Sequence, residues 1–317
     1  MKIFITGIAG VLGSQLAELF IEMGFKVAGN DVVRREEAWR LENIIDKMKY
    51  IWKSSWDLVC EDVRGYDIIF DCGLEFPDRP MGDSSPTHTL IGNLMPPLRL
   101  LEAVRRCYTR PIVVYVSSFN ALYGHTGATF TEKTLPLPSN LYGLTKACAE
   151  SLYYIYHKAY EVPIIITRTG SAFGPRMRSD ELPARLIIHG LKGRTFTLRS
   201  PQAKRLWTYS KDVLNFYDKL LEKINNCVGL TLHSCGNLGD KIVSNVELAT
   251  IIKHFIPELN WVLGDYEPGE LVNGQPISFS VDSTLTRKLL NWKPQYTLED
   301  GLKETVNWFK KNIWRYL

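Results

Sequence analysis

The sequence predicts an α/β fold in which helices cover both faces of a doubly wound parallel sheet, with a smaller α/β region toward the C-terminus. Short apolar runs alternate with stretches of helical apolar spacing over about the first 170 residues. The runs are apolar at successive positions, as strands are when both of their faces are buried. Beyond that point Pro175, Pro183 and Pro201 interrupt the alternation. We therefore expect a large N-terminal domain and a smaller C-terminal cap, with a cleft between them.

The expected strands follow from these apolar runs. The first is residues 2–6, and the second begins at 26–28 and stops near Asp31. Further strands are expected at residues 67–71, 112–117 and 163–168. A short strand near 230–234 is expected to return to the same sheet.

Helices are expected between and after the strands. Ser14 to Met23 has helical apolar spacing, and Gly24 ends that helix. Residues 93–106 and 141–160 have the same spacing, and the closing stretch from Leu298 to Phe309 is amphipathic.

The domain boundaries follow from where this pattern changes. We expect the first domain to comprise residues 1–169 and about 210–236. The cap then comprises residues 170–209 and about 237–317.

Composition excludes several classes of protein. The net charge of +4 is small and unclustered, which argues against a nucleic-acid partner. No apolar run reaches the roughly 18 residues that cross a bilayer. Gly7 follows the first strand before an apolar stretch of signal-peptide length develops, so we expect no export signal. The six cysteines form no Cys-x-x-Cys pair, so we expect reduced thiols in a cytoplasmic protein. The six histidines lack metal-ligand spacing, and no metal is expected.

A glycine-rich turn joins the first strand to the first helix. It reads Thr6-Gly7-Ile8-Ala9-Gly10-Val11-Leu12-Gly13, a G-x-x-G-x-x-G spacing. Glycines allow a tight turn and a close approach of the backbone to a pyrophosphate, whose charge then meets the helix N-terminus. The alternative is an ordinary strand–turn–helix connection, since turns need glycine anyway. The position between strand and helix favours a Rossmann-type dinucleotide site.

Asp31 ends the second strand at about the distance expected for a ribose ligand. Its carboxylate can accept hydrogen bonds from both adenosine ribose hydroxyls and would repel a 2′-phosphate, which favours NAD over NADP. Arg34 and Arg35 follow closely and can hold a 2′-phosphate, so NADP stays open. Asp62 and Val63 precede the third strand and can reach the adenine edge, although a plain loop aspartate is an equal alternative.

Tyr142 and Lys146 are the candidate catalytic pair. They are four residues apart near the start of a predicted helix, so both side chains lie on one face. A phenol ionises near pH 10, and bringing it toward neutrality takes ~3 pKa units, or ~4 kcal/mol, from a nearby positive charge. The ammonium of Lys146 and an oxidised nicotinamide can supply that charge. The alternative is a surface i,i+4 pair without chemistry.

These motifs together resemble the extended short-chain dehydrogenases/reductases, in particular the nucleotide-sugar epimerase and dehydratase branch. The resemblance covers nearly the whole chain. The motifs that carry it are the glycine turn, Asp31, Asp62-Val63, Asn93, Leu100-Leu101-Glu102-Ala103, Val116-Ser117-Ser118, Tyr123-Gly124, the Tyr142/Lys146 pair, Phe173-Gly174-Pro175-Arg176, Arg205-x-Trp-x-Tyr-x-x-Asp212-Val213 and Leu289-Leu290-Asn291-Trp292-Lys293-Pro294.

The resemblance implies a nucleoside-diphosphate-sugar substrate, NAD as cofactor and a homodimer formed through the helices at 93–106 and 141–160. Tyr142 would be the base and Lys146 would bind the nicotinamide ribose. The other cofactor contacts it implies are Gly7, Gly10, Val11, Leu12, Gly13, Asp31, Asp62, Val63, Cys72, Gly73, Leu74, Val116, Ser117 and Thr169. The implied substrate contacts are Ser118, which is also the third catalytic residue, Asn120, Ser171, Arg176 and Arg205.

Several positions depart from the family pattern. Phe119 occupies the usual place of the catalytic Ser or Thr, and Ser118 lies one residue earlier. Asn120-Ala121 replaces the acidic residues of dehydratases and decarboxylases, so elimination and decarboxylation lose their acid. Residues 71–74 (Asp-Cys-Gly-Leu) replace the usual His-x-Ala-Ala at the cofactor wall, and Glu267 stands where an arginine often binds phosphate.

The leading hypothesis is an NAD-dependent epimerase that works through a transient 4-keto sugar. The alternative is a dehydrogenase or 4-keto-sugar reductase of the same fold that releases oxidised or reduced product. A third hypothesis, from another class, is a dinucleotide-binding protein whose chemistry has decayed. The intact Tyr142/Lys146 pair favours the first two.

Overall fold

The computed structural model describes residues 1–74 and 85–316. The chain forms two compact units: the first comprises residues 1–121, 136–168 and 223–232, and the second comprises residues 122–135, 169–222 and 233–317. These units differ from the expected domains because 122–135 and 210–222 group with the second unit. The reason is local packing, since helix α6 (Ser210–Glu222) packs against β11 and α8, which both belong to that unit.

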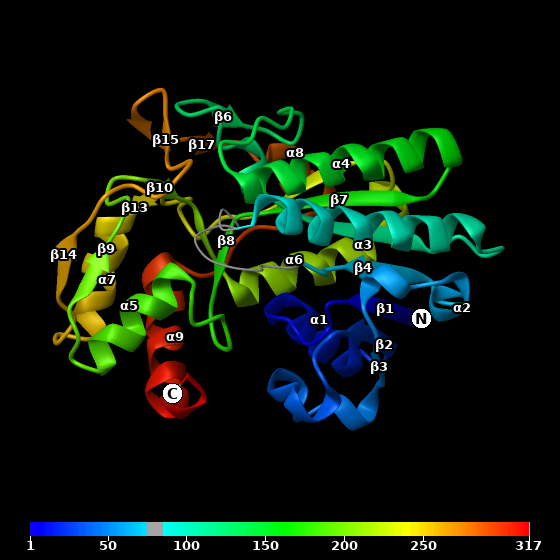
Figure 1. Cartoon of the computed structure of the whole chain (residues 1–317), viewed down its shortest axis with the longest axis horizontal. Helices are drawn as coiled ribbons and strands as arrows, with labels where there is room; N and C mark the ends of the chain where they lie inside the picture. The colour runs from blue at the N-terminus through cyan, green and yellow to red at the C-terminus, as the bar shows by residue number, and fades with distance from the viewer. Residues whose placement is uncertain (75–84, 317) are drawn as a thin grey trace. The chain divides into compact units, whose positions relative to one another are not determined.

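A seven-stranded sheet forms the centre of the first unit (Figure 1). Its spatial order is β12 (Thr231–Ser234), β7 (Ile164–Thr169), β5 (Ile112–Ser118), β4 (Ile68–Asp71), β1 (Lys2–Thr6), β2 (Lys26–Asp31) and β3 (Lys49–Trp52). The pairs β1–β2, β1–β4, β4–β5 and β2–β3 are parallel. The chain therefore winds outward in both directions from β1, which confirms the Rossmann-type fold.

Strand β3 was not predicted. It is a four-residue strand that pairs with β2, and none of its residues is buried. Its apolar run, Tyr50 to Trp52, is three residues long, which is shorter than the runs of about 4–8 residues that identify a buried strand. The short returning strand expected near 230–234 is present as β12.

Four helices accompany this sheet. They are α1 (Val11–Glu22), α2 (Cys60–Val63), α3 (Pro86–Arg106) and α4 (Leu141–Tyr160). Helix α3 begins seven residues before its predicted start, because Pro86 occupies the first turn, where a proline needs no hydrogen-bond donor. Helix α4 has the predicted bounds: the Asn140 side chain accepts a hydrogen bond from Gly143 N (2.7 Å) at its start.

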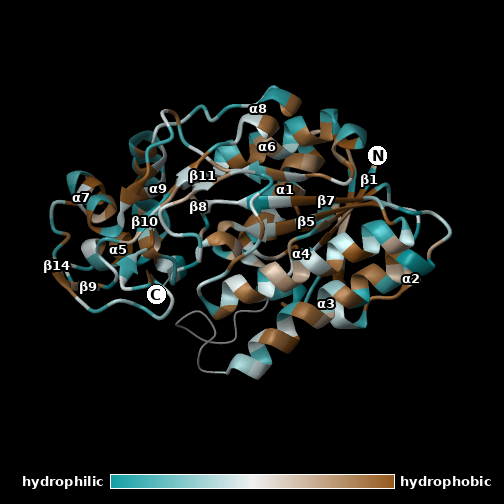
Figure 2. Ribbon diagram, turned by 90° about the horizontal axis from the view of Figure 1, so that it is seen from above, coloured by the Kyte–Doolittle hydropathy of each residue, from teal (hydrophilic) through white to brown (hydrophobic). Residues whose placement is uncertain are grey.

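The sheet divides the core of the first unit into two layers, one on each of its faces. Phe4 and Val113 pack with Leu101 of α3 and Tyr153 of α4, whereas Phe70 points the other way and contacts Phe20 of α1 (4.9 Å between ring centroids). Figure 2 shows strands that are apolar along their length between α1 on one side and α3 and α4 on the other. Helices on both faces are what a doubly wound sheet requires.

The second unit has its own core. Helices α5 (Leu182–Leu191), α7 (Asn245–Phe255) and α9 (Leu298–Asn312) enclose it together with four paired strands: β8 (Ser171–Phe173) with β11 (Trp207–Tyr209), and β9 (Phe196–Leu198) with β14 (Trp261–Leu263). The remaining elements are α8 (Thr284–Leu290) and the pairs β10 (Lys204–Arg205) with β13 (Val243–Ser244), β6 (Thr129–Phe130) with β17 (Ser280–Val281), and β15 (Leu271–Val272) with β16 (Gln275–Pro276).

One pair of cysteines differs from the expectation of reduced thiols. Cys60 of α2 and Cys107 at the end of α3 form a disulfide, with Cα atoms 5.5 Å apart. Residues this far apart in sequence pair because α2 packs against α3, which brings the two Cα atoms within the span of a disulfide. Cys72, Cys148, Cys227 and Cys235 are free.

Within the described part of the chain, no helix is both long and apolar enough to span a bilayer. Residues 1–74 and 85–316 hold no cluster of three potential metal ligands.

The core of the second unit generates a stability prediction. Phe309 of α9 is completely buried, so we expect Phe309→Ala to lower the free energy of unfolding by about 3–5 kcal/mol. Trp314 lies nearby in sequence but is 61% exposed, and Trp314→Ala should change that free energy by less than about 0.5 kcal/mol. Urea titration followed by circular dichroism measures both. Equal losses for the two variants would contradict this description of the core.

Candidate active site

The glycine turn holds the backbone too tightly for side chains. Gly7 has a φ of +61°, and a Cβ there would lie 2.9 Å from Gly73 Cα. A Cβ on Gly13 would lie 2.3 Å from Gly7 O, and Gly10 N already donates a hydrogen bond to that carbonyl (3.0 Å). Gly7 and Gly13 are therefore required by close contact with backbone. The turn also lies in close contact with the backbone of Cys72 and Gly73, which follow β4.

Helix α1 begins directly after this turn. Gly10 is its N-cap residue and brings no side chain, while Val11 and Leu12 form its first turn. The first amides of a helix have no carbonyl partner within the helix, and they attract anions. This turn is therefore a cradle that fits a pyrophosphate.

Asp31 closes the same turn from the end of β2. Its Oδ2 accepts a hydrogen bond from Ala9 N (2.9 Å), and its Oδ1 accepts one from Val33 N (3.1 Å). The carboxylate is thus held in one orientation beside the glycine turn, and each oxygen keeps a lone pair for a further donor. This geometry fits the ribose role expected from the sequence.

Asp62 and Val63 have structural roles in α2. Asp62 forms an ion pair with Lys53 (2.6 Å) and accepts a hydrogen bond from Val59 N (3.0 Å). Val63 is buried in the core beside α3. Their contact with an adenine remains a prediction.

Lys146 lies one helical turn after Tyr142 in α4, and its ammonium is buried. Lys146 Nζ donates a hydrogen bond to Val116 O (2.8 Å) and lies 5.0 Å from the centre of the Tyr115 ring. Burial lowers the pKa of Lys146 to about 8, while Asp71, Cys72 and Glu150 oppose that shift. Burial therefore makes the charged form of this lysine less stable than that of an exposed lysine.

The residues after β5 meet the start of α4. A Cβ on Gly143, next to Tyr142, would lie 2.4 Å from Asn120 O, and Asn140 Nδ2 donates to Asn120 Oδ1 (3.2 Å). Asn120 in turn donates two hydrogen bonds to Ser118 Oγ, from its backbone N and its Nδ2 (3.2 Å each). The helix start that carries Tyr142 and the segment that carries Ser118 are thus joined.

Phe119 occupies the position where the family carries a catalytic Ser or Thr, and Ser118 precedes it. Phe119 is 1% exposed and belongs to the core, so its side chain supplies no polar group. Ser118 is only half-buried at the carboxyl end of β5, and its hydroxyl bonds to Asn120. This placement supports Ser118 over Phe119 as the hydroxyl donor, which stays a prediction.

Ser117 faces into the protein. Its hydroxyl donates to Glu150 Oε1 (2.6 Å), and Arg168 of β7 forms an ion pair with the same carboxylate (2.8 Å). Both charged side chains are about 5% exposed. The Ser117 hydroxyl therefore orders this buried pair, and any cofactor contact of Ser117 falls to other atoms.

The residues after β4 complete the wall of the turn. Gly73 N donates to Thr6 Oγ1 (3.0 Å), and the Thr6 hydroxyl donates to Asp71. Cys72 and Leu74 flank Gly73 in the same loop. At the end of β7, the hydroxyl of Thr169 is buried without a hydrogen-bond partner among the described residues. An unpartnered buried hydroxyl fits the predicted contact with a bound group.

Three of the predicted substrate residues, Ser171, Arg176 and Arg205, belong to the second unit. The guanidinium of Arg205 lies 4.8 Å from the centre of the Tyr123 ring and forms a buried ion pair with Glu270. Burial raises the pKa of Tyr123. The charge of Arg205 and a hydrogen bond with Ser171 of β8 lower it, but by less. Arg176 is half-buried after β8 and has a left-handed φ of 64°. Arg205 is therefore partnered by a carboxylate.

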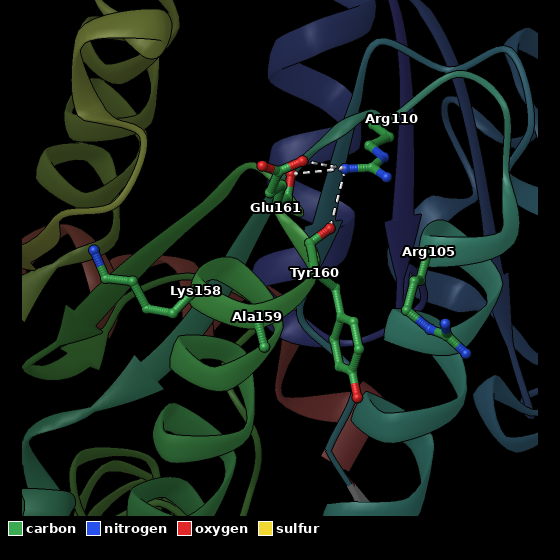
Figure 3. Close-up of a pocket in the computed structure, with 6 residues that line it drawn as sticks. All are labelled: Arg105, Arg110, Lys158, Ala159, Tyr160 and Glu161. Carbon is green, nitrogen blue, oxygen red and sulfur yellow. Dashed lines mark hydrogen bonds and ion pairs between the residues drawn. The ribbon is translucent and has the colours of Figure 1, made fainter.

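A separate hollow of about 370 Å³ lies near the amino ends of β5 and β7 (Figure 3). It is lined by Arg105, Arg110, Lys158, Ala159, Tyr160 and Glu161. These residues lie at the ends of α3 and α4, just before β5 and β7 begin. Ligands of open parallel sheets bind at the carboxyl ends of the strands, so this hollow is not the candidate site.

Several residues of the site escaped sequence reasoning. Glu150 acts on the charge of Lys146 and pairs with Arg168. Tyr153 donates a hydrogen bond to Asp71, and Glu270 pairs with Arg205. One signal was available: Glu150 and Tyr153 follow Lys146 at positions i+4 and i+7, on the same face of the helix. Glu270 carried no such signal, because its partner lies 65 residues away.

Comparisons with known proteins agree with this geometry. The sequence model described as "NAD dependent epimerase/dehydratase family" matches residues 3–229. A Bacillus subtilis (strain 168) protein named as an uncharacterised UDP-glucose epimerase is 26% identical, over 96% of this chain and 97% of its own length.

Two further proteins are similar over their full lengths. A dTDP-glucose 4,6-dehydratase of Neisseria gonorrhoeae is 25% identical, over 98% of this chain and 96% of its own. The crystal structure of UDP-glucuronic acid 4-epimerase from Bacillus cereus, in complex with UDP-glucuronic acid and NAD, matches with a TM-score of 0.86 at 22% identity. It covers 98% of this chain and 100% of its own.

The carboxylate beside the glycine turn generates a binding prediction. We expect Asp31→Asn to weaken NAD binding about tenfold or more, because a charged acceptor contributes about 1.5–3 kcal/mol to a hydrogen bond. Affinity for NADP should fall less, since the variant no longer repels a 2′-phosphate. Isothermal titration with each dinucleotide measures the two constants.

Asp67→Asn is the matched control. Asp67 lies just before the amino end of β4, at the end of the strand away from the glycine turn, and accepts a hydrogen bond from Lys2 N (2.7 Å). Its substitution should leave both dinucleotide affinities within about twofold. An Asp31→Asn protein that binds NAD as tightly as this control would remove Asp31 from the site.

Proposed function

Because the chain belongs to the NAD dependent epimerase/dehydratase family, of the extended short-chain dehydrogenase/reductase type, we propose that it epimerises a nucleotide-sugar through a transient 4-keto sugar. NAD is the cofactor of this family. The observation that carries the proposal is the Tyr142/Lys146 pair on the first turns of α4, with its lysine buried on Val116 O. An enzyme with this pair oxidises and reduces a hydroxyl carbon.

Each residue of the pair has a definite task. NAD, when bound, would supply a reversible hydride acceptor at the hydroxyl carbon. Tyr142 takes the hydroxyl proton as the carbonyl forms and gives it back on reduction. The Lys146 ammonium stabilises the phenolate and binds the nicotinamide ribose. Ser118 donates a hydrogen bond to the reacting oxygen.

Asn120 favours epimerisation over dehydration. Dehydratases occur among the relatives, and elimination of water needs a general acid beside the sugar. The side chain that follows Phe119 is an amide, already bonded to Ser118 and Asn140. An amide cannot protonate a leaving hydroxyl group, so the keto sugar is returned to the alcohol.

The substrate proposal uses the cations of the second unit. A nucleoside diphosphate carries two phosphates, which guanidinium groups bind in charge-assisted pairs. We assign this role to Arg205 and Arg176, with Asn120, Ser118 and Ser171 as contacts of the sugar. Glu270 holds Arg205 in the absence of such an anion and is displaced or reoriented when one binds. Relatives whose names include a UDP- or dTDP-sugar support this class.

The net dehydrogenase or reductase remains the second candidate. The same Tyr142/Lys146 pair serves either reaction, and the family includes enzymes with other outcomes. A decayed binding protein is disfavoured by the ordered contacts of Lys146. A cytoplasmic location also stays a prediction, and the Cys60–Cys107 disulfide is the observation against it, since such bonds are rare in that compartment.

A panel of UDP- and dTDP-sugars tests the reaction. We expect inversion at C4, read by NMR of the sugar, with no net change in the absorbance of reduced nicotinamide. Stoichiometric reduction of NAD would instead identify a dehydrogenase. Tyr142→Phe should lower kcat by about 10²- to 10⁴-fold, because it removes the general base, and should leave NAD affinity nearly unchanged.

Tyr108→Phe is the control for that variant. Tyr108 is fully exposed, so its hydroxyl is expected to contribute nothing to turnover. Full activity of Tyr142→Phe would refute the proposed mechanism, even if epimerisation itself were observed.

We also propose a homodimer formed through α3 and α4. The two helices pack side by side, and they expose large apolar side chains that include Tyr154 (59%) and Ile155 (52%). An exposed apolar helix pair is typical of a protein interface. The exposed large apolar side chains of α3 and α4 are Ile91, Leu144, Tyr154, Ile155 and Tyr160.

Sedimentation tests the dimer. We expect the protein to sediment at twice the chain mass, and Ile155→Asp to sediment as a monomer because it buries an unpaired charge in the interface. Leu263→Asp places the same charge on a 65% exposed site in β14 and should leave the dimer intact. A wild-type monomer at micromolar concentration would end this proposal.

A further inference from the structure

We propose that Asp71 is a positioning residue that keeps Lys146 charged and ties it to the glycine turn. The inference rests on the proposed function, because that function gives Lys146 its task. The pattern of the family places a histidine at this position, so the device would belong to this chain and to relatives that share its aspartate.

Asp71 lies at the centre of a buried hydrogen-bond network. The Thr6 hydroxyl donates to Asp71 Oδ1, and the Tyr153 hydroxyl donates to Asp71 Oδ2. Thr6 and Tyr153 are fully buried and Asp71 is 3% exposed. Thr6 also accepts a hydrogen bond from Gly73 N (3.0 Å) and directly precedes Gly7. One carboxylate therefore connects the glycine turn with α4.

The same network reaches Lys146 through two aromatic rings. The Tyr153 ring stacks on the Tyr115 ring, with centroids 4.3 Å apart and planes within 14°. The ammonium of Lys146 also lies near the Tyr115 ring, 5.0 Å from its centre. Asp71, Tyr153, Tyr115 and Lys146 thus form a contiguous chain of contacts, and moving Asp71 would move the support of the lysine.

The charges around Lys146 single out Asp71. Glu150 of the same helix acts on the charge of Lys146, and so do Asp71 at the end of β4 and Cys72 just after it. From β5, the Tyr115 ring faces the ammonium. Glu150 is compensated by its buried ion pair with Arg168 (2.8 Å). The hydrogen-bond partners of Asp71 are neutral hydroxyls. Asp71 is therefore the carboxylate whose charge is left to act on the lysine.

The direction of the effect follows from burial. Burial lowers the pKa of Lys146 to about 8, and the charge of Asp71 works against that shift. Burial raises the pKa of Asp71, whereas Lys146 and the two hydroxyls lower it. The Asp71 charge therefore opposes the effect of burial, and removing that charge should lower the pKa of Lys146 further.

The test measures Lys146 itself in the protein without substrate. Trace acetylation by acetic anhydride between pH 6 and 10, read by peptide mass spectrometry, yields the pKa of Lys146. NAD affinity over the same range should fall as the lysine loses its proton. We expect Asp71→Asn to move both midpoints down by about one pH unit. Tyr153→Phe, which keeps the ring and removes one hydrogen bond to Asp71, should move them in the same direction by less.

Two matched controls separate charge from folding. Asp212→Asn changes another buried aspartate, one that accepts hydrogen bonds from Gln295 N (2.7 Å) and Tyr296 N (3.2 Å) in the second unit. Tyr156→Phe removes a hydroxyl from the next turn of α4, where it donates to Glu102 (2.6 Å). Both variants should leave the midpoints within about 0.2 pH units of wild type, whatever they do to thermal stability.

The outcomes are distinct. An unchanged Lys146 midpoint in folded Asp71→Asn overturns the inference, as does an equal shift in the controls. If Asp71→Asn does not fold, Tyr153→Phe decides by the same criterion. Failure of the proposed epimerase reaction is a separate result, because neither midpoint requires turnover of a nucleotide-sugar.

Discussion

The buried ammonium of Lys146 is the constraint on which the site of the first unit depends. A charge removed from water is costly unless polar and charged neighbours replace the lost solvation. Here Val116 O, the Tyr115 ring, Asp71 and Glu150 do so. They come from β5, from the end of β4 and from α4 itself, so these elements must keep one register for the lysine to remain charged.

The second unit meets the same constraint in another way. Arg205 is buried against Tyr123, and Glu270 supplies its counter-charge. Breaking such a pair by removing one partner costs about 3–5 kcal/mol, because the other charge stays buried. An anionic substrate must therefore compete with Glu270 for the guanidinium. The guanidinium expected to bind phosphate is therefore already oriented, but it is occupied by Glu270.

The elements that sequence reasoning predicted well are those with a local signature. The glycine turn, β1 and α4 lie where expected, because tight turns, buried strands and long amphipathic helices each impose a residue pattern. Strand β3 lacked that pattern, since pairing at the sheet edge leaves it half exposed. The start of α3 was missed because Pro86 begins the helix with a residue that usually interrupts one.

The sequence by itself determined the fold class, the dinucleotide turn with Asp31, and the Tyr142/Lys146 pair, because each is written in neighbouring residues with fixed spacing. Only the tertiary structure decided which side chains surround that pair. Asp71 meets Thr6 and Tyr153 across 65 and 82 residues of chain. Such contacts depend on strand order and on which face of α4 meets the sheet. No local pattern encodes them, and they decide how the lysine is held.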